Sequence, residues 1–361
     1  MRRTGVAYLP LHGGKAPTWL FERMVKLARE VLYILCLEYN QKEILYRLSD
    51  PFWFQAFGCL LGFDWHSSGV TTTVCGAIKE ALKDIGREIG LFAVGGKGKT
   101  ALKTPQELII VGEWTGLEVT PLIKTSRLSA KVDNIALQDG YQLYHHCLFF
   151  TTEGAWAVVQ QGMNVASRYA RRYHWLGEKV KSFVCEPHSA ICSMKKEQNV
   201  LNLVARESEA TRQGSVELLK EHPEKLLKEW EKINTLHLPS HHQIFIKDID
   251  LKRLKQNLIV AKEASPKDFE SLLGIRGIGA KTLRALSLIA EVIYGAKPSF
   301  KDPARYAFAH GGKDGHPYPV SKKLYDQSIE ILKKAVNAAK IGYTEKLKAL
   351  KRLANFHARM D

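Results

Sequence analysis

Two aspartates and two histidines lie close together near the middle of the sequence. Asp133 and Asp139 are six residues apart, and His145 and His146 follow them. Carboxylate and imidazole groups are ligands for divalent cations, and both can move a proton. The histidines are neighbours on an expected strand, so they point to opposite faces, and at most one of them shares a site with Asp139. This segment predicts a metal or acid–base site.

A second polar cluster lies upstream, in the sequence Asp64-Trp65-His66-Ser67-Ser68. It combines an acid, an imidazole and two hydroxyls, which fits either a metal or general-base site or a buried hydrogen-bond cluster. We take Mg²⁺ or Mn²⁺ as the expected ion, held by Asp64, Asp139 and His145. The predicted catalytic residues are Asp64, His66, Asp133, Asp139, His145 and Gln160.

The most specific local pattern covers residues 265–286 and indicates a helix, a tight turn and a second helix. Ser265 and Asp268 form an expected capping box at the start of the first helix. Gly277 and Gly279 allow a tight turn and leave the main-chain amides uncovered where the second helix begins. Amides at the amino terminus of a helix bind anions, so the turn is a candidate phosphate site.

This segment resembles the helix-hairpin-helix family, whose Gly-hydrophobic-Gly turn holds a DNA backbone phosphate through main-chain N–H groups without reading sequence. The resemblance covers about thirty residues. The alternative is an ordinary tight helical turn in which the glycines serve only sterics. The resemblance and the nearby cations imply DNA contacts at Gly277, Gly279, Ala280, Lys281, Thr282 and Arg284.

The charge balance favours a polyanionic partner. Lys and Arg number 53 against 37 Asp and Glu, a net charge of +16, which points first to nucleic acid. Residues 168–175 interleave arginines with aromatic rings, as where a nucleic-acid strand is neutralised and stacked, although Tyr169 and Tyr173 could equally be core. Basic glycine-rich loops at 95–100 and 310–313 can hold phosphate. These segments add the predicted DNA contacts Arg168, Arg171, Arg172, Lys97, Lys99 and Lys313.

The elements that must position these groups predict an α+β protein. We expect a mixed domain with a small β-sheet flanked by helices over residues 1–235, and a mostly helical domain with the helix-hairpin-helix over residues 248–361. Pro239 and the polar residues around it mark residues 236–247 as a linker.

Local patterns predict several of the elements. Apolar residues at helical spacing indicate helices over residues 18–49 and 71–83. A capping-box pattern from Thr104 to Glu107 indicates the start of another helix. The strand candidates Tyr141–Phe150 and Trp156–Gln161 are separated by a turn and predict a β-hairpin.

Other features bear on the cellular setting. No stretch approaches the roughly 18–20 apolar residues that cross a bilayer, and no signal-peptide pattern follows the first arginines, so we expect a cytoplasmic protein without a membrane partner. The six cysteines form no CxxC pair and are expected to be core thiols.

At whole-chain scale the strings LPLHGGKAP, GFDWHSSGVTTT, QDGYQLYHH and FAHGGKDGHPYPV look like a family of archaeal and thermophilic-bacterial proteins catalogued as a domain of unknown function. The resemblance spans nearly the full length. It implies no activity and transfers no catalytic residues, so the expected function must come from the chemistry.

Three functions follow from that chemistry. The leading hypothesis is a metal-dependent DNA nuclease for repair or recombination, whose ion activates water at the scissile phosphate. The second is a base-excision glycosylase/AP lyase: Lys281 follows the second hairpin glycine, where the bifunctional helix-hairpin-helix glycosylases carry their nucleophile, and Asp302 would be the acid. The third is a non-catalytic DNA-binding adaptor. A homodimer is compatible with each of them.

Overall fold

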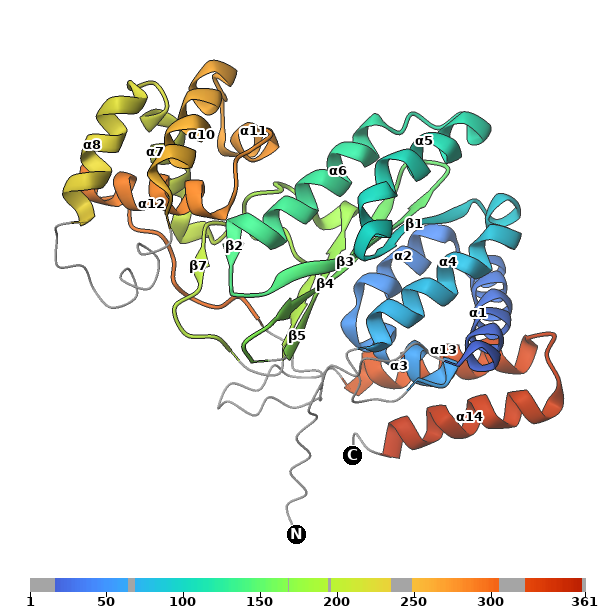
Figure 1. The fold of residues 1–361 in the computed structure, drawn as a ribbon. Coiled ribbons are helices and arrows are strands. Elements are labelled where there is room, and N and C mark those ends of the chain that lie inside the picture. Colours follow the sequence, from blue (N-terminus) through green and yellow to red (C-terminus); the bar gives the residue numbers. More distant parts are fainter. Residues whose placement is uncertain are drawn as a thin grey trace, which may run out of the picture.

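The architecture is α+β, as the sequence predicts. The computed structural model describes residues 17–63, 69–167, 169–193, 196–234, 249–304 and 322–358 of the 361-residue chain. A five-stranded antiparallel sheet lies in the N-terminal half, and the C-terminal part is mostly helical. Figure 1 shows helices on both sides of this sheet, with the α7–α12 group beyond one end of it.

The strands follow the order β1-β3-β4-β5-β6, and every neighbouring pair is antiparallel. The predicted hairpin is confirmed, since β3 and β4 pair along their length. A second, two-stranded sheet joins β2 to β7. The strand bounds are β1 Leu91–Lys97, β2 Leu137–Gln138, β3 Gln142–Thr151, β4 Trp156–Asn164, β5 Tyr169–Leu176, β6 Ala190–Cys192 and β7 Leu201–Asn202.

One face of the sheet is covered by helices from both ends of the chain. The predicted helix over 18–49 is two helices, because Asn40 caps a new helix by accepting a hydrogen bond from the Glu43 amide at 2.8 Å. The helix predicted over 71–83 is confirmed, and it extends further at both ends. The bounds are α1 Thr18–Glu38, α2 Gln41–Ser49, α3 Pro51–Leu61, α4 Gly69–Ile89, α13 Lys322–Ala338 and α14 Tyr343–Ala358.

The opposite face carries α5 and α6, and it leads into the remaining helices. The helix predicted from Thr104 is confirmed, but its capping box is wrong: the Glu107 carboxylate accepts from the Gly95 amide and from Lys79 Nζ, each at 2.7 Å. The bounds are α5 Thr104–Thr115, α6 Thr120–Lys131, α7 Glu209–Leu218, α8 Pro223–Asn234, α10 Leu251–Ala264, α11 Phe269–Gly274 and α12 Ala280–Tyr294. Short helical turns occur at Gly98–Lys103, Val132–Ala136, Gly177–Lys179 and Arg206–Ser208.

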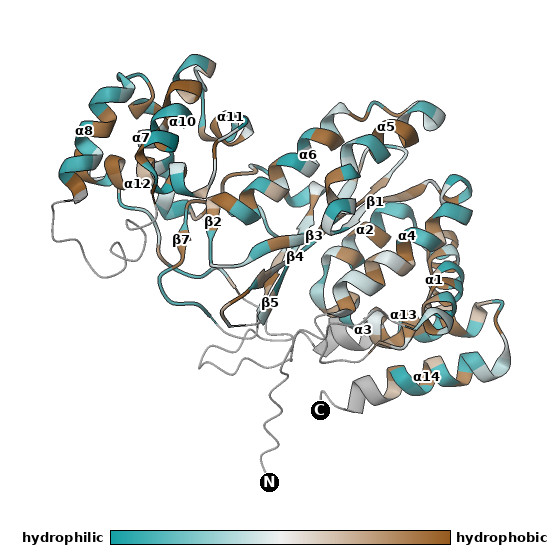
Figure 2. Ribbon diagram, viewed as in Figure 1, coloured by the Kyte–Doolittle hydropathy of each residue, from teal (hydrophilic) through white to brown (hydrophobic). Residues whose placement is uncertain are grey.

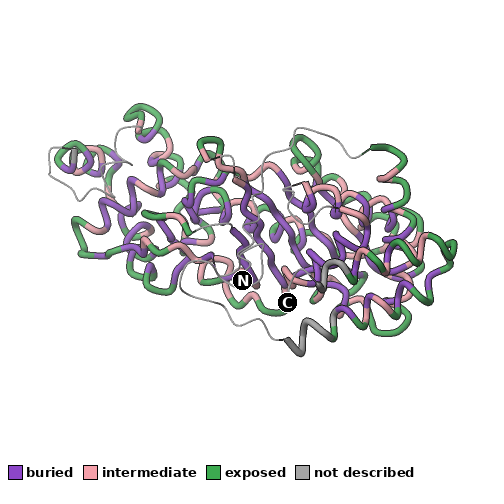
Figure 3. The backbone as a smooth tube through the Cα atoms, turned by 90° about the horizontal axis from the view of Figure 1, so that it is seen from below, coloured by how far each residue is buried: buried purple, intermediate pink, exposed green. Residues whose placement is uncertain are grey.

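The expected linker at 236–247 lies outside the described residues, and each of the two hydrophobic cores combines helices that precede it with helices that follow it. Helices α7 and α8, which precede it in the chain, pack on α12 in the core that contains the second face of the sheet. Helices α13 and α14, which follow it, pack on α1 and α3 in the other core. Figure 2 shows mixed polar and apolar faces on these helices, and Figure 3 shows the buried backbone concentrated along the middle of the molecule. Helices that are distant in the sequence therefore pack together through their apolar faces, and the cores do not follow the order of the segments along the chain.

None of the helices among the described residues is both long enough and apolar enough to cross a membrane.

Candidate nucleic-acid interface

The predicted helix, turn and helix around Gly277 are confirmed by α11 and α12. Gly277 has φ +93°, a backbone conformation that glycine adopts without strain. Between the two glycines, the Ile278 side chain is buried in the core and fixes the turn from inside. The expected cap at Ser265 is wrong: Asp268 is the N-cap of α11 and forms its capping box with Ser271. Ser265 instead ends α10 in the left-handed region.

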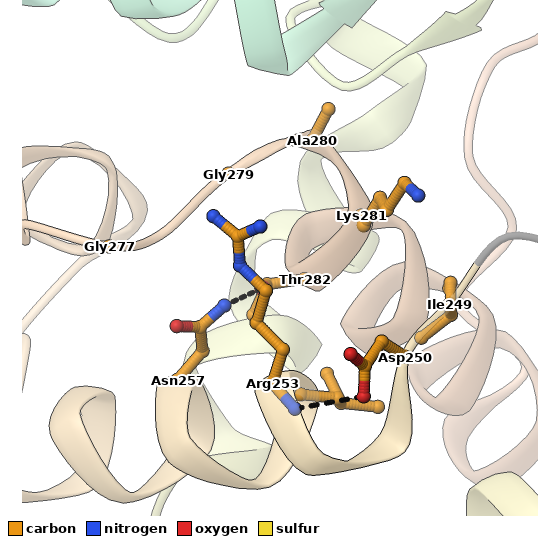
Figure 4. Close-up of a pocket in the computed structure, with 10 residues that line it drawn as sticks. Ile249, Asp250, Arg253, Asn257, Gly277, Gly279, Ala280, Lys281 and Thr282 are labelled. Atoms are coloured by element: carbon orange, nitrogen blue, oxygen red, sulfur yellow. Dashed lines mark hydrogen bonds between the residues drawn. The ribbon is translucent and has the colours of Figure 1, made fainter.

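A cavity of about 420 Å³ lies beside this turn. Figure 4 shows the backbone from Gly277 to Ala280 along one side, with Arg253 and Asn257 projecting from α10 on the other. The cavity is lined by Ile249, Asp250, Arg253, Leu254, Asn257, Gly277, Gly279, Ala280, Lys281 and Thr282. Main-chain amides, an amide side chain and two cationic side chains thus face one hollow.

The first turn of α12 supplies the anion-binding groups. Its N-cap is Gly279, which has no side chain to accept hydrogen bonds from the first amides, and the helical pattern begins with Leu283 N bonding to Gly279 O at 3.1 Å. The partial positive charge of a helix amino terminus therefore faces the cavity. Arg253 and Lys281 are exposed and add full charges. This combination suits one backbone phosphate.

Contacts with α6 and β2 hold the turn in position. Lys131 Nζ, at the end of α6, donates to the Leu273 carbonyl and to the Ile275 carbonyl, the latter at 2.7 Å. Its partial burial lowers the pKa of Lys131. Gln138 Nε2 donates to the Ala280 carbonyl at 2.8 Å. The hairpin is therefore fixed at both of its ends.

Two predicted DNA contacts in α12 have structural partners. Arg284 Nε donates to Gln138 Oε1 at 2.9 Å, so part of this guanidinium holds α12 against β2. The Thr282 side chain is buried, and its hydroxyl accepts from Asn257 Nδ2 at 2.8 Å. The Thr282 hydroxyl is therefore part of the wall of the cavity, and its backbone amide is the group left for an anion.

The prediction that Arg171 contacts phosphate is contradicted by its burial in an ionic cluster. Arg171 is 0% exposed in its side chain and donates to Asp139 Oδ2 at 2.9 Å and to Asp302 Oδ2 at 2.6 Å. The Tyr173 hydroxyl donates to the same oxygen of Asp139 at 2.7 Å. Burial raises the pKa of Asp139, while Arg171 acts in the opposite direction. The guanidinium thus neutralises internal carboxylates.

Arg172 is also buried, on the opposite face of the sheet. Its Nε donates to His174 Nε2 at 2.9 Å and its Nη1 to Gln55 Oε1 at 3.1 Å. Burial lowers the pKa of Arg172. The alternation of β5 sends Arg171, Tyr173 and Trp175 to one face and Arg172 and His174 to the other. Arg171 and Arg172, the two described arginines of residues 168–175, are therefore both buried and form no exposed cationic surface.

Asp133 and Gln160 join a buried hydrogen-bond chain. The Asp133 carboxylate accepts from Gln160 Nε2 at 2.6 Å and from Trp175 Nε1 at 2.9 Å, and it pairs with His188. Gln160 Oε1 bonds to His146 Nδ1 at 2.8 Å. These two predicted catalytic residues are thus brought together, but with internal partners.

The predicted metal set is not assembled on one face. Asp139 lies with Arg171 and Tyr173, whereas His145 pairs across the strands with Gln161 and points to the other face. Asp64, the third expected ligand, lies outside the described residues, as do His66, Arg168 and Lys313. Among the residues that are described, no three His, Cys, Asp or Glu side chains gather around one point. One ion cannot bridge Asp139 and His145 in this fold.

The basic loop after β1 is exposed. Lys97 ends the strand and Lys99 lies in the helical turn that follows. Both side chains reach solvent, so both could meet a polyanion. They differ in their surroundings, because Lys97 alone stands opposite a buried residue, His145.

A family model described as protein of unknown function (DUF763) matches residues 5–320. The chain belongs to this family. Neither the curated proteins nor the solved structures gave a match.

Arg253 and Asn257 are two cavity residues of this DUF763 member that the sequence patterns did not indicate. They lie on α10, before the recognised motif, and are four residues apart, so they share one face of that helix. Their spacing, together with the position of α10 just before the motif in the chain, is the one sequence pattern that could have pointed to these two residues. It carries little weight by itself because exposed helices are generally rich in such residues.

Acid should destabilise the protein through three buried histidines. Burial is the largest cause of the lowered pKa of His145, His146 and His174, and it brings the pKa of His145 to about 3. The unfolded chain binds these protons near pH 6.5, so the penalty begins there and grows until the folded pKa is reached. For His145 we expect the free energy of unfolding to fall by up to about 1.4 kcal/mol per pH unit between pH 6.5 and its folded pKa of about 3, and His146 and His174 act in the same direction.

Urea unfolding between pH 7.5 and 4.5 measures this slope. His145→Gln should remove one histidine's share of the slope and leave the remainder. An unchanged slope in this variant would show that His145 titrates normally in the folded protein.

Proposed function

We propose that this protein binds DNA by its sugar–phosphate backbone, without reading sequence, at the cavity between α10 and the hairpin of α11 and α12. The observation that carries this proposal is the cavity itself, in which the amino terminus of α12 and the side chains of Arg253 and Asn257 face the same space. Contacts of this kind position a protein on a nucleic acid but carry no base information.

The groups around the cavity match a phosphate diester. Main-chain amides bond to an anion more strongly than to a neutral acceptor, and the α12 dipole acts in the same sense. The ammonium of Lys281 and the guanidinium of Arg253 are exposed for longer-range attraction. Asp250 also lines the cavity, and its carboxylate caps α10, with Oδ1 accepting from the Lys252 amide at 2.9 Å and from the Arg253 amide at 3.3 Å.

The net charge supports the same partner. A net charge of +16 attracts polyanions over the whole surface. The buried Arg171 cluster does not account for this surplus, because in it one arginine pairs with two aspartates. The hairpin would give this general attraction a fixed docking point.

Fluorescence anisotropy with two duplexes of unrelated sequence tests the proposal. We expect equal dissociation constants for the two duplexes and a plot of log K against log salt with a slope of about −2 to −4, from a few neutralised phosphates. A strong preference for one duplex, or affinity that is independent of salt, would contradict backbone binding.

The chemistry performed on the bound DNA stays a prediction. A metal-dependent nuclease should cleave with Mg²⁺ or Mn²⁺ and stop on addition of EDTA. A glycosylase/AP lyase should be trapped on damaged DNA by borohydride through Lys281 and should ignore EDTA, and an adaptor should bind without turnover. The homodimer also stays a prediction, which sedimentation of the free protein would decide.

A further inference from the structure

A row of polar side chains crosses the sheet on the face covered by α3 and α4. The strand register sets Lys97 opposite His145, and His145 opposite Gln161. It also sets Gln161 opposite Arg172. Directly opposed residues of antiparallel strands have Cβ atoms about 4.5–5.5 Å apart, so each member can contact the next. We call these four residues the polar row.

His145 is the unusual member of the polar row. It is 1% exposed, and neither ring nitrogen has a hydrogen-bond partner. Its neighbour His146, on the other face, has both nitrogens bonded, to Ser126 Oγ at 2.9 Å and to Gln160 Oε1 at 2.8 Å. Buried polar atoms are nearly always paired, so an imidazole with two unpaired nitrogens indicates a group that meets a ligand.

The surroundings of His145 are electropositive. Burial, together with His146 and Lys97, lowers the pKa of His145 to about 3, so at neutral pH the ring is uncharged and has one donor and one acceptor. The guanidinium of Arg172 lies two strands away and the ammonium of Lys97 directly opposite. Asp50, the N-cap of α3, interacts electrostatically with Arg172. Its carboxylate also accepts a hydrogen bond from the Trp53 amide at 2.7 Å.

The amino-terminal half of α4 packs over the same area. Cys75 of α4 contacts Cys147, which lies two residues along β3 from His145. Thr71 is one turn nearer the amino terminus, fully buried, and its hydroxyl has no partner. The first turn of α4 contains no acidic residue, and the helix dipole places a partial positive charge at this end.

One end of the polar row reaches solvent. Lys97 is exposed, and its Nζ lies 5.8 Å from the centroid of the Tyr144 ring. The Tyr144 hydroxyl in turn accepts from Gln161 Nε2. The polar row therefore leads from an exposed ammonium to a buried guanidinium.

We propose that the polar row and the first turns of α4 bind a phosphate dianion, either inorganic phosphate or the phosphate monoester at the end of a nucleic-acid strand. Two cations, an imidazole N–H and the Thr71 hydroxyl supply charge and donors, and the polar row itself contains no acid that would suit a metal ion instead. An internal diester carries two sugars and needs an open groove, whereas this site is buried except at Lys97. The second of these ligands, the phosphate at a strand end, rests on the proposed DNA binding.

The first test uses sodium phosphate as the probe with the full chain. Calorimetry against sodium chloride of equal ionic strength should show saturable phosphate binding to the wild type. Lys97→Ala and His145→Gln should each weaken it at least about tenfold, while Lys103→Ala, which changes an exposed lysine outside the polar row, should leave it unchanged. Absence of saturable binding, or equal losses in Lys97→Ala and Lys103→Ala, would overturn the proposal.

A separate measurement tests whether the variants are folded. Lys97 is exposed, so Lys97→Ala should keep the wild-type circular dichroism spectrum even if His145→Gln is destabilised. In the wild type, phosphate should also shift the ¹⁵N resonances of the His145 ring. Unshifted His145 resonances at saturating phosphate would place the ion elsewhere and would overturn the assignment.

A second test separates the two sources of phosphate and isolates the hairpin. Short oligonucleotides with a 5′-phosphate, a 3′-phosphate or only hydroxyl ends compete against inorganic phosphate in a Gly279→Glu background, which blocks the cavity at α12. Competition by a phosphorylated end alone assigns a strand end, and failure of all three assigns the free ion. If Gly279→Glu leaves duplex binding intact, the proposed DNA function fails while the phosphate result stands.

Discussion

Gly279→Glu should lower the affinity for duplex DNA by about 10- to 100-fold, which corresponds to about 1.5–3 kcal/mol. Gly279 lines the cavity, and a Cβ at this position would meet no atom within 4 Å, so the new side chain fits without disturbing the fold. Its φ of −127° is open to any residue. The carboxylate would stand at the first turn of α12, where we place the phosphate, and would repel it.

Gly274→Glu is the matched control for this prediction. Gly274 ends α11 on the other side of the turn, is exposed, and also has no atom within 4 Å of a built Cβ. Both variants change the net charge by one unit, so they affect long-range attraction alike. Anisotropy titrations at equal salt should show a large loss only for Gly279→Glu. Equal losses in both variants would mean that general charge, and not the hairpin, binds DNA.

Asp302→Asn should lower the free energy of unfolding by about 1–3 kcal/mol, because the amide nitrogen that replaces one carboxylate oxygen cannot accept a hydrogen bond and leaves a buried donor without its acceptor. The Asp302 carboxylate accepts from Arg171 and also from two main-chain amides, Glu197 N at 2.6 Å and Ala304 N at 2.9 Å. It therefore connects β5 to the segment that follows α12. Urea or thermal unfolding followed by circular dichroism measures the effect.

An exposed ion pair is the control for this second prediction. Glu80→Gln breaks the pair of Glu80 with Lys83, whose side chains are both exposed, and it should change stability by less than about 1 kcal/mol. The glycosylase hypothesis, which uses Asp302 as the catalytic acid, predicts the opposite pattern. Under that hypothesis Asp302→Asn would abolish base excision while the unfolding free energy stayed near the wild-type value.

Much of the fold follows from short-range patterns in the sequence. The helices of the hairpin motif, the β3–β4 pair and the α+β class were predicted because each depends on local spacing, turn residues or strand alternation. The same alternation correctly separated the faces of His145 and His146. Helix starts were less certain, since several polar residues near α11 can act as a cap and only packing selects Asp268.

The sequence by itself determined the helices α11 and α12 with the glycine turn between them and the cationic surplus, because backbone conformation and net charge are properties of neighbouring residues and of composition. Only the tertiary structure decided what the charged residues do. The burial of Arg171 requires Asp302, which lies 131 positions away, and the isolation of His145 depends on helices packed over its face. Whether a charged side chain or an imidazole is buried with partners or exposed to ligands depends on the residues that the fold brings next to it. The spacing of residues along the sequence does not specify those tertiary contacts.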